Sequence, residues 1–522
     1  TIDPIRAAAA GYAVAIQDVR GRWASEGGPF FLYRNEFADG FDTVAWAAGL
    51  PYGDGKVGAY GVSYMGATSW QTATTAPPAL GAIAPTTAPN DFWEDHIWRD
   101  GALLLGTLAM WSTQAIGPSA LLRSKTPDLV PALLRLVDDI DGFDERMWHL
   151  PLSTFPPARP DRPGFLDFFF EVLRHPARDD FNRSLLVADR HGSVRVPALI
   201  IAGWHDLLLA ADLEHYRRMR TEAATDEARE RTRIVIGPWS HGSFLNVVGE
   251  RDFGFRASGF FMDLREDLTS LHLRWFDRWL KGKRNGVDEE PPVRLFVQGI
   301  DRWRDEHEWP LARARPTPLY LGSTGRLGFA PPATTDPPDS YVYDPHQPCP
   351  TRGGTLLMPR TYPAGPVDQA PILSRRDVLA YRSEPLTADV EVTGPVTCVL
   401  WAATTGRDTD WMVKLCDVHP DGRTLNVCDG VLRARYSRST ETPELLPAGQ
   451  PHRLEIRLWA TSMVFRAGHR FCVLVTSSDF PRYDRNLNSG ELGIDSDRMV
   501  AALQTVFHDA ERPSHILLPI VP

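Results

Sequence analysis

The sequence predicts a protein of the α/β class, with a parallel sheet in its first part and an all-β region at its C-terminal end. Up to about residue 310, short apolar runs alternate with helical segments, which is typical of parallel strands that are buried on both faces. After that point the helical patterns disappear, and apolar and polar residues alternate with a period of two. Several such strands joined by turn-rich segments indicate a β-sandwich or jelly roll.

Residues 1–95 are predicted to begin the parallel sheet. Strands are expected at 13–16, 57–61 and 81–85, and helices at 36–48 and 64–76. Because helices join consecutive parallel strands, we expect right-handed crossovers between them.

A helical insertion is predicted between residues 96 and 190. This segment is rich in leucine at helical spacing, and proline-rich stretches such as FPPARPDRPG interrupt it. The sheet is expected to resume over 191–310 with the apolar runs ALIIAGWHD and IVIGPWSH.

An amphipathic helix is predicted at 271–282. Its spacing places Leu271, Trp275 and Trp279 on one side. We expect this side to pack against the sheet.

Composition and charge exclude several classes of function. The 522-residue chain has a net charge of -10 and a pI near 5.9, and its arginines are scattered among Asp and Glu, so nucleic acid is a poor candidate partner. No stretch approaches the roughly 20 apolar residues that span a bilayer, which argues against a membrane role. With no visible secretory leader we expect a cytoplasmic protein. Because the chain begins at Thr1 without a methionine, the loss of a leader remains an alternative. A homo-oligomer is a separate alternative.

The spacing of cysteine and histidine predicts no bound metal. The five cysteines are odd in number, have no CxxC spacing and lie in the last third of the chain, so we interpret them as free thiols in the core. No cluster of His, Cys and carboxylate residues has ligand spacing. Neither a phosphate-binding loop nor a GxGxxG fingerprint opens a helix. We therefore expect neither a metal nor an organic cofactor.

Ser63 lies in the stretch GVSYMG, after a predicted strand and before a predicted helix. This is the context of a nucleophile elbow, a tight turn in which neighbouring residues must be small so that strand and helix can pass closely. Gly61 and Gly66 meet that need, although Met65 stands where the plain G-x-S-x-G motif has its second glycine. Taken alone, the stretch is equally compatible with a small-residue turn that has no catalytic role.

Asp206 and His241 come directly after two later predicted strands. Functional loops of a parallel sheet gather outside the carboxyl ends of its strands, and the order Ser, Asp, His is the order that this kind of triad requires. We expect His241 to take the proton of Ser63 and later return it to the leaving group. Asp206 would fix the imidazole tautomer and stabilise its cationic form.

Four other residues are rivals for these roles. His205 adjoins the proposed acid and is interpreted as a pocket or surface residue, while His272 lies within the amphipathic helix and suits packing or the surface. Asp91 and Asp95 also follow a predicted strand. Either would serve as the acid if the insertion began elsewhere.

Five motifs and the β-rich tail together resemble the cocaine esterase family of serine hydrolases; the motifs are IQDVRG, ASEG, GVSYMG, AGWHD and GPWSH. That family is similar to the Xaa-Pro dipeptidyl-peptidases and the α-amino acid ester hydrolases. The resemblance covers essentially the whole chain. It implies an α/β-hydrolase domain at 1–95 and 191–310, a helical cap at 96–190 and a jelly-roll domain at 311–522.

The resemblance also implies roles for individual residues. Ser63 matches the family nucleophile, Asp206 the triad acid and His241 the base, and the backbone N–H of Tyr64 would belong to the oxyanion hole. In the family, further strands precede GYAVAIQD, and a tyrosine in that lead-in provides the second oxyanion donor. We therefore expect an N-terminally truncated version of a longer enzyme, and a poor catalyst as the sequence stands, since one lost donor costs about 10²–10³ in turnover.

Five residues bear on the predicted specificity. Trp111 matches a family position near the acyl pocket and Trp98 is a plausible neighbour, so an aromatic wall would suit a bulky apolar acyl group; both would serve equally well as core of the cap. Leu207 and Leu208 replace the glycine and aromatic of the cocaine-hydrolysing relatives, which argues against cocaine itself. Met65 stands where α-amino acid ester hydrolases tend to have glutamate, which slightly weakens the assignment to that branch of the family.

The sequence therefore predicts a serine hydrolase that cleaves a carboxylic ester or an activated acyl compound through an acyl-enzyme. The nearest alternative is amide hydrolysis on the same triad, by an Xaa-Pro dipeptidyl-peptidase or a β-lactam acylase. A dipeptidyl-peptidase also needs carboxylates that hold the free amino terminus of its substrate; the candidates are Asp128, Asp138, Asp139 and Asp141. The third hypothesis is a non-catalytic protein whose jelly roll binds carbohydrate.

Overall fold

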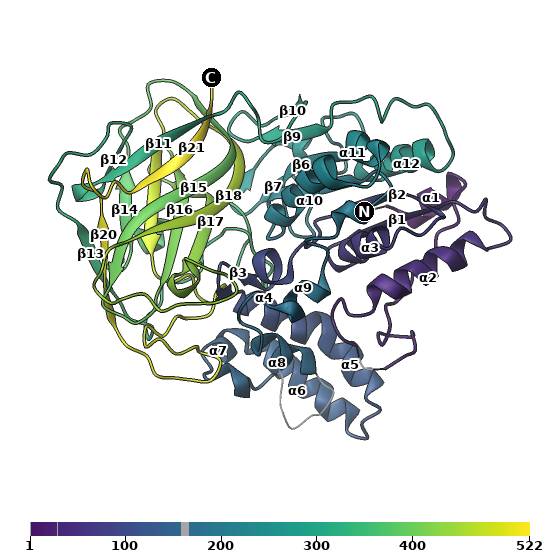
Figure 1. Ribbon diagram of the computed structural model, residues 1–522, viewed down its shortest axis with the longest axis horizontal. Helices are drawn as coiled ribbons and strands as arrows, with labels where there is room; N and C mark the ends of the chain where they lie inside the picture. The colour runs from purple at the N-terminus through teal and green to yellow at the C-terminus, as the bar shows by residue number, and fades with distance from the viewer. Residues whose placement is uncertain (1, 29, 158–165) are drawn as a thin grey trace. The chain divides into compact units, whose positions relative to one another are not determined.

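The computed structural model describes residues 2–28, 30–157 and 166–522, and the chain forms two compact units (Figure 1). The first unit comprises Thr1–His96, Asp180–Val248 and Asp252–Trp309; the second comprises Ile97–Asp179, Gly249–Arg251 and Pro310–Pro522. The helical insertion thus shares its unit with the β-rich C-terminal part. In the described part of the chain, no helix combines the length and the apolar character needed to cross a bilayer.

A six-stranded sheet forms the centre of the first unit. Its strands, in spatial order, are β1 (Val57–Val62), β2 (Leu80–Thr86), β5 (Leu199–His205), β6 (Arg233–Ser240), β9 (Val293–Val297) and β10 (Arg302–Glu306). The first five run parallel, and β10 is antiparallel to β9. β5 and β6 are buried along their whole length, as expected for strands with both faces covered. The predicted α/β-hydrolase sheet is confirmed.

The expected strand at 13–16 is wrong. Residues 12–19 have no regular secondary structure, and Ile16 is 79% exposed. Tyr12 and Val14 pack against the core of the unit, while the Tyr12 hydroxyl donates a hydrogen bond to Asp277, 2.7 Å away. An apolar run becomes a strand only where a neighbour pairs with its N–H and C=O groups, and no ladder of the described residues includes this segment.

Helices surround the sheet of the first unit. They are α1 (Pro4–Ala9), α2 (Glu36–Ala48), α3 (Tyr64–Thr74), α9 (Asp180–Leu185), α10 (Leu209–Glu222), α11 (Asp226–Arg231) and α12 (Leu268–Trp279), with a short π-helix η1 (Phe92–His96) and the short 3-10 helices η4 (His191–Ser193) and η5 (Phe255–Ala257). Leu271 and Trp275 of α12 are buried against the strands, and Trp279 is half-buried. The Trp275 indole N–H donates to the Ile83 carbonyl at 3.1 Å, which fixes α12 on β2.

The part of the predicted helical insertion that belongs to the second unit, Ile97–Asp179, consists of short elements. They are β3 (Trp98–Arg99), β4 (Ala102–Leu103), α4 (Leu105–Met110), η2 (Trp111–Ile116), α5 (Gly117–Arg123), α6 (Leu129–Asp141), α7 (Phe143–Met147), η3 (Leu152–Thr154) and α8 (Asp167–Leu173). The predicted proline-rich break at 155–164 falls partly outside the described residues. Helix α6 is exposed along one apolar side, which carries Val130, Leu134 and Val137.

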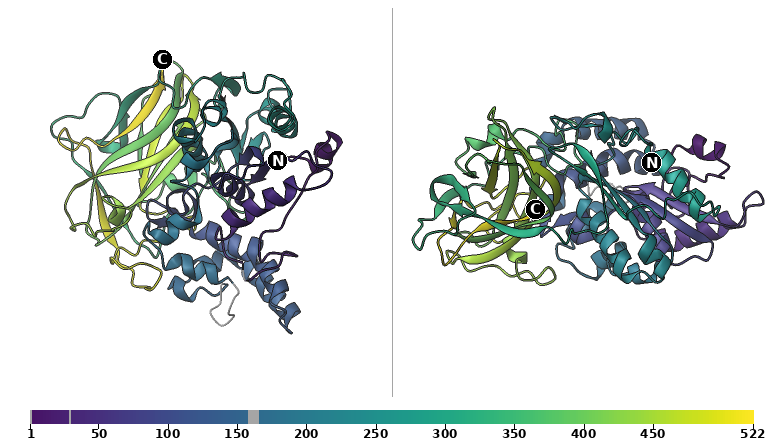
Figure 2. Two further views of the ribbon diagram at one scale, coloured as in Figure 1. Left: turned by 45° about the vertical axis from the view of Figure 1, so that its right-hand side comes forward. Right: turned by 90° about the horizontal axis from the view of Figure 1, so that it is seen from above.

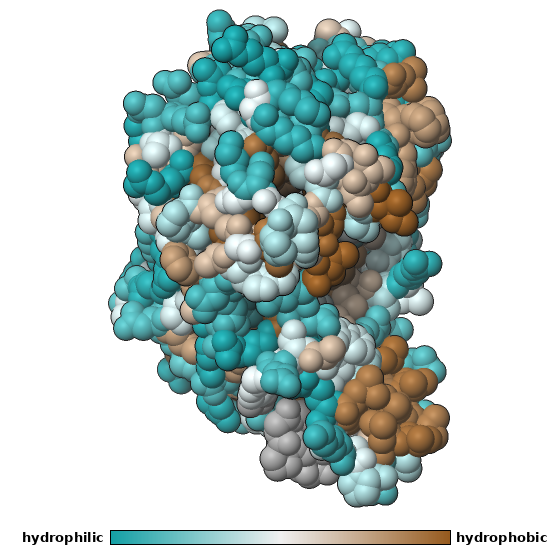
Figure 3. Space-filling view, turned by 90° about the vertical axis from the view of Figure 1, so that its right-hand side faces the viewer, coloured by the Kyte–Doolittle hydropathy of each residue, from teal (hydrophilic) through white to brown (hydrophobic). Residues whose placement is uncertain are grey.

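Figure 3 shows that apolar side chains gather at several places on one face of the protein.

The C-terminal part of the second unit is a β-sandwich of antiparallel strands, apart from one parallel bridge between β12 and β14. Its strands are β11 (Arg315–Gly322), β12 (Arg326–Gly328), β13 (Asp339–Tyr343), β14 (Leu379–Arg382), β15 (Val390–Thr404), β16 (Asp410–Val418), β17 (Thr424–Arg433), β18 (His452–Phe465), β19 (Arg470–Thr476), β20 (Ala502–Phe507) and β21 (His515–Val521). Figure 2 shows these strands in green and yellow with a common twist. The predicted jelly-roll domain is confirmed.

The period-two pattern of this region is the cause of its fold. Along β18 the side chains of Leu454, Ile456 and Leu458 are buried, whereas the intervening charged side chains are exposed. Alternating side chains point to opposite faces of a strand, so one face enters the core and the other faces water. The five cysteines of the chain lie buried and free in this domain, as predicted.

Candidate active site

Ser63 occupies the sharp turn between β1 and α3. Its backbone has φ 60° and ψ −120°, a conformation that residues other than glycine rarely adopt. The Ser63 N–H donates to the carbonyl of Thr86 on the neighbouring strand at 2.9 Å, which ties the turn to the sheet. A strained backbone of this kind persists only where its surroundings hold it, and such positions cluster at active sites.

Two glycines make room for this turn. A Cβ atom on Gly61 would lie 2.4 Å from the backbone of Met65, and one on Gly66 would lie 2.9 Å from the Ala88 Cβ. Because helix and strand approach so closely here, the displaced second glycine of GVSYMG performs the same packing role as in the plain motif.

Gly61→Ala is therefore expected to lower the free energy of unfolding by about 1–3 kcal/mol, because the added methyl overpacks against main chain that cannot give way. Urea unfolding of both proteins measures the difference. Gly192→Ala is the matched control. A Cβ atom on Gly192 would lie 3.7 Å from its nearest neighbour, the Glu222 carbonyl oxygen, which is an ordinary van der Waals distance. Equal losses in the two variants would contradict the close approach at Gly61.

The structure brings together the three residues that the sequence singles out. The His241 Nε2 atom lies 2.9 Å from the Ser63 Oγ atom, and Nδ1 of the same ring lies 3.0 Å from each carboxylate oxygen of Asp206. Asp206 is fully buried, and the His241 side chain is 7% exposed. One imidazole therefore connects a hydroxyl with a carboxylate, an arrangement that allows proton transfer from the hydroxyl.

The segment that joins β5 to α10 holds the carboxylate of Asp206 in place. The Leu208 N–H donates to Asp206 Oδ1 at 2.8 Å, and the Asp206 N–H donates to the Gly203 carbonyl at 3.1 Å. The side chains of Leu207 and Leu208 are each 1% exposed and belong to the core of the unit. Their assignment to substrate binding stays a prediction.

The two rival histidines have other partners. His205 Nε2 lies 2.9 Å from Gln298 Oε1, and His272 Nδ1 lies 2.6 Å from the Leu268 carbonyl within its own helix. Burial lowers the pKa of His272 to about 3, so a neutral ring that caps a helical carbonyl is favoured there. These contacts fit packing roles.

The two rival carboxylates organise a local turn. Asp91 Oδ1 accepts hydrogen bonds from the N–H groups of Trp93 and Glu94, at 2.9 and 3.0 Å. Asp95 Oδ1 accepts from the N–H groups of Asn90 and Asp91, both at 3.1 Å. His241 contacts Asp206 instead.

A buried network, which no sequence pattern predicts, surrounds Tyr64, the residue after Ser63. The Tyr64 hydroxyl donates to Glu36 and accepts from the Tyr33 N–H at 3.1 Å. The rings of Tyr33 and Tyr64 stack with centroids 4.5 Å apart, and the Tyr33 hydroxyl lies 3.0 Å from His96 Nε2. Burial raises the pKa of Glu36. No spacing rule joins residues 33, 36 and 64, so only the fold reveals this network.

Tyr64→Phe is expected to lower the free energy of unfolding by about 1–3 kcal/mol, because it leaves the buried Glu36 carboxyl and the Tyr33 N–H without the partner that they share. Chemical unfolding curves measure the loss. Tyr60→Phe, at a half-buried position on β1, is the control and should stay within about 0.5 kcal/mol of the parent protein. A Tyr64→Phe protein as stable as the control would refute the network.

Asp212 on α10 is a second carboxyl that only the fold reveals. It is fully buried, and its Oδ1 atom accepts a hydrogen bond from the Ala88 N–H at 3.0 Å. Burial raises the pKa of Asp212 well above its usual range, and the charge of Asp206 adds to this effect. The neutral form of Asp212 is therefore favoured in the folded protein, so that a second negative charge beside the triad carboxylate is avoided.

This pKa shift predicts a pH dependence of stability. In this pH range the folded chain keeps a proton on Asp212 that the unfolded chain releases. The free energy of unfolding therefore decreases as pH rises from about 4 through the raised pKa of Asp212. Asp212→Asn keeps the acceptor oxygen and removes the titration, so its stability should fall less than that of the parent protein over this range. Urea unfolding at several pH values tests this, with exposed Glu227→Gln as control. Identical slopes for Asp212→Asn and the parent would contradict the assignment.

The predicted pocket aromatics lie in the second unit. Trp98 is 1% exposed within β3, and the ring of Trp111 meets Phe168 nearly edge-on with centroids 6.1 Å apart. A role of Trp98 and Trp111 in substrate binding stays a prediction.

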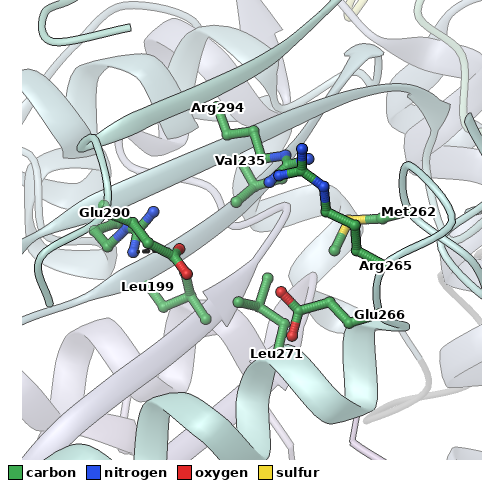
Figure 4. Close-up of a pocket in the computed structure, with 9 residues that line it drawn as sticks. Leu199, Val235, Met262, Arg265, Glu266, Leu271, Glu290 and Arg294 are labelled. Atoms are coloured by element: carbon green, nitrogen blue, oxygen red, sulfur yellow. Dashed lines mark ion pairs between the residues drawn. The ribbon is translucent and has the colours of Figure 1, made fainter. Parts of the chain in front are cut away.

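A small cavity in the first unit lies away from the triad. Its volume is about 10 Å³, and it is lined by charged and apolar side chains that include Leu199, Arg233 and Glu290 (Figure 4). Leu199 and Arg233 begin β5 and β6, whereas Asp206 and His241 follow the ends of the same strands, roughly 23–26 Å further along. Arg233 and Glu290 form an ion pair at 2.7 Å, so that their opposite charges offset each other at this end of the sheet. The cavity has no part in the chemistry of Ser63.

Comparison with known proteins places the chain in a family. A family model described as X-Pro dipeptidyl-peptidase (S15 family) matches residues 2–243, and one described as X-Pro dipeptidyl-peptidase C-terminal non-catalytic domain matches residues 285–517. The chain is 38% identical to the cocaine esterase of Rhodococcus sp. (strain MB1 Bresler), over 98% of this chain and 88% of that protein. The chain belongs to the cocaine esterase family. It is therefore a serine hydrolase.

Two solved structures share this architecture. An aminopeptidase from the marine sediment archaeon Thaumarchaeota archaeon has a TM-score of 0.78 and 25% identity, over 97% of this chain and 85% of that one. An alpha-amino acid ester hydrolase has a TM-score of 0.73 and 25% identity, over 96% of this chain and 84% of that one. The fold of this esterase family thus also occurs in a peptidase, so the fold alone does not choose between an ester and an amide.

Proposed function

We propose that this member of the cocaine esterase family hydrolyses carboxylic esters through an acyl-enzyme on Ser63. The observation that carries the proposal is the hydrogen-bonded chain from Ser63 Oγ through His241 to Asp206, with distances of 2.9 and 3.0 Å. Its position outside the carboxyl ends of β1, β5 and β6 supports a catalytic role.

In the acylation step, Ser63 Oγ attacks the ester carbonyl carbon while His241 Nε2 takes the hydroxyl proton. The buried Asp206 carboxylate stabilises the imidazolium that forms and holds Nδ1 protonated. The tetrahedral intermediate then collapses, the bond between the carbonyl carbon and the leaving oxygen breaks, and His241 gives its proton to the alcohol. The acyl group remains on Ser63.

In the deacylation step, water takes the place of the alcohol. His241 removes a proton from the water as the water oxygen attacks the acyl carbon, and the second tetrahedral intermediate expels Ser63 Oγ. The proton returns from His241 to Ser63, and the carboxylic acid leaves. One base therefore serves both halves of the reaction.

The backbone N–H of Tyr64 is proposed as a donor to the oxyanion. Tyr64 is the first residue of α3, where N–H groups have no acceptor within the helix and the positive end of the helix dipole favours negative charge. The contacts of its hydroxyl and ring with Glu36 and Tyr33 support a fixed position of this residue. Such a preorganised donor stabilises the charge that develops on the carbonyl oxygen.

The names of the relatives support esters as substrates, since one is a cocaine esterase and another an alpha-amino acid ester hydrolase. We propose that Trp98, Trp111, Leu207 and Leu208 each contribute to substrate binding. The two tryptophans supply large apolar surfaces, which suit a bulky acyl group.

Amide hydrolysis is the second candidate, because the X-Pro dipeptidyl-peptidase model matches residues 2–243. A p-nitrophenyl ester and a dipeptidyl-proline p-nitroanilide, measured with the same preparation, separate the two functions. The proposal expects a higher kcat/KM for the ester, after correction for the uncatalysed rate of each compound. Faster turnover of the anilide would replace it with a dipeptidyl-peptidase.

A further inference from the structure

Three potential metal ligands meet at one end of the β-sandwich, far in sequence from the triad. β16 and β19 are antiparallel neighbours, with Asp417 opposite Phe471 and Val418 opposite Arg470. Continuing the same register by one residue sets His419 opposite His469. The fold thereby joins the stretch DVH to a histidine 50 residues later, which is why the spacing of the sequence gives no sign of the cluster.

We propose that Asp417, His419 and His469 bind a divalent transition metal ion of the Zn²⁺ type. His469 Nδ1 lies 2.9 and 3.0 Å from the two Asp417 oxygens, and His419 Nε2 lies 3.3 Å from Asp417 Oδ2. The two imidazole rings have centroids 4.5 Å apart. One ligand atom from each residue lies within 4.8 Å of both others.

These separations suit a tetrahedral ion. Ligand atoms at about 2.0–2.1 Å from a tetrahedral Zn²⁺ are about 3.3 Å from one another, close to the distances from each imidazole to the Asp417 carboxylate. Two imidazole nitrogens and one carboxylate oxygen are donors that Zn²⁺ and its neighbours in the first transition row accept, whereas Ca²⁺ and Mg²⁺ prefer oxygen alone. Three protein ligands leave the fourth position for water.

Burial gives a second, independent observation. The Asp417 side chain is 2% exposed, and those of His469 and His419 are 15% and 21% exposed. Within the described part of the chain, the buried His419 Nε2 atom makes no hydrogen bond although it faces Asp417. Buried polar atoms are normally paired, so a nitrogen in this position calls for a ligand.

Metal binding requires only a local proton shift. When the His469 proton lies on Nδ1, it is donated to Asp417 at 2.9 and 3.0 Å; transfer of this proton to Nε2 frees the Nδ1 lone pair for the metal. The carboxyl oxygens of Asp417 already face both rings, and Nε2 of His419 coordinates when its proton lies on Nδ1. The bound ion would tie the end of β16 to the turn before β19, and thereby stabilise the sandwich against unfolding.

The experiment uses the whole chain after treatment with EDTA and removal of the chelator. Co²⁺ replaces Zn²⁺ as a spectroscopic probe, because a tetrahedral site gives visible d–d absorption. We expect about one equivalent of Co²⁺ per chain, its displacement by Zn²⁺, and a higher melting temperature with Zn²⁺ than without. Absence of the absorption and of retained Zn²⁺ in the folded parent protein would overturn the proposal.

Variants locate the ion. His419→Phe and His419→Asn should each weaken binding by about tenfold or more, since the loss of groups that merely support ligands already costs 10–100-fold. His346→Phe is the matched control: this exposed histidine pairs with Asp344 at 2.9 Å. It should bind the ion as the parent does. Unchanged binding in both folded His419 variants would place the ion elsewhere and refute the site.

Discussion

Ser63→Ala is expected to lower kcat for a p-nitrophenyl ester by about 10⁶. Without the hydroxyl no acyl-enzyme forms, and His241 loses the group 2.9 Å from its Nε2 atom whose proton it takes. The residual rate would come from substrate binding and oxyanion stabilisation alone, which still exceed the rate in water. Steady-state rates under saturating ester measure the loss.

The matched control for this experiment is Ser69→Ala on the same helix. The Ser69 hydroxyl donates to the Met65 carbonyl at 3.0 Å, whereas the hydroxyl that faces His241 is that of Ser63. Its removal should leave kcat within a few-fold of the parent. Ester turnover by pure Ser63→Ala protein within tenfold of the parent rate would mean that another residue is the nucleophile.

Asp206→Asn is expected to lower kcat by about 10⁴ while substrate binding changes little. The asparagine has the shape of the aspartate, but its amide group can donate to Nδ1 and so favours the tautomer with the proton on Nε2. That tautomer presents an N–H to Ser63 Oγ instead of a lone pair, so no base is available. The missing negative charge also destabilises the imidazolium.

Asp212→Asn is the control for the second experiment, because it changes a buried carboxyl only six residues away that contacts the Ala88 N–H. Its kcat should stay within a few-fold of the parent. If Asp206→Asn and Asp212→Asn lost activity equally, the loss would reflect general disturbance of this segment, and the role of Asp206 as the partner of His241 would be contradicted.

The fold and the candidate triad are predictable because both rest on local patterns in a fixed order. Apolar runs that alternate with helical segments predict β5, β6 and their neighbours. The parallel sheet then brings the residues after each strand to one edge. Ser63, Asp206 and His241 each follow such a strand. Period-two alternation in β18 likewise predicts the sandwich.

The remaining features depend on contacts between distant segments. The run at 13–16 has the composition of a strand, but a strand also needs a partner, which its own sequence does not specify. Glu36 and Asp212 are ordinary helix residues in the sequence, and only burial against Tyr64 and Ala88 gives them a role. His469 meets Asp417 because of the register between β16 and β19.

Intact mass analysis after exposure to a fluorophosphonate tests the central claim most directly. The reagent reacts with a serine only when a base removes its proton and an oxyanion site accepts the developing charge. We expect one adduct per chain in the parent protein, none in Ser63→Ala, and, after digestion of the parent adduct, a modified peptide that contains Ser63. No adduct in folded parent protein, or an adduct that persists in Ser63→Ala, would contradict it.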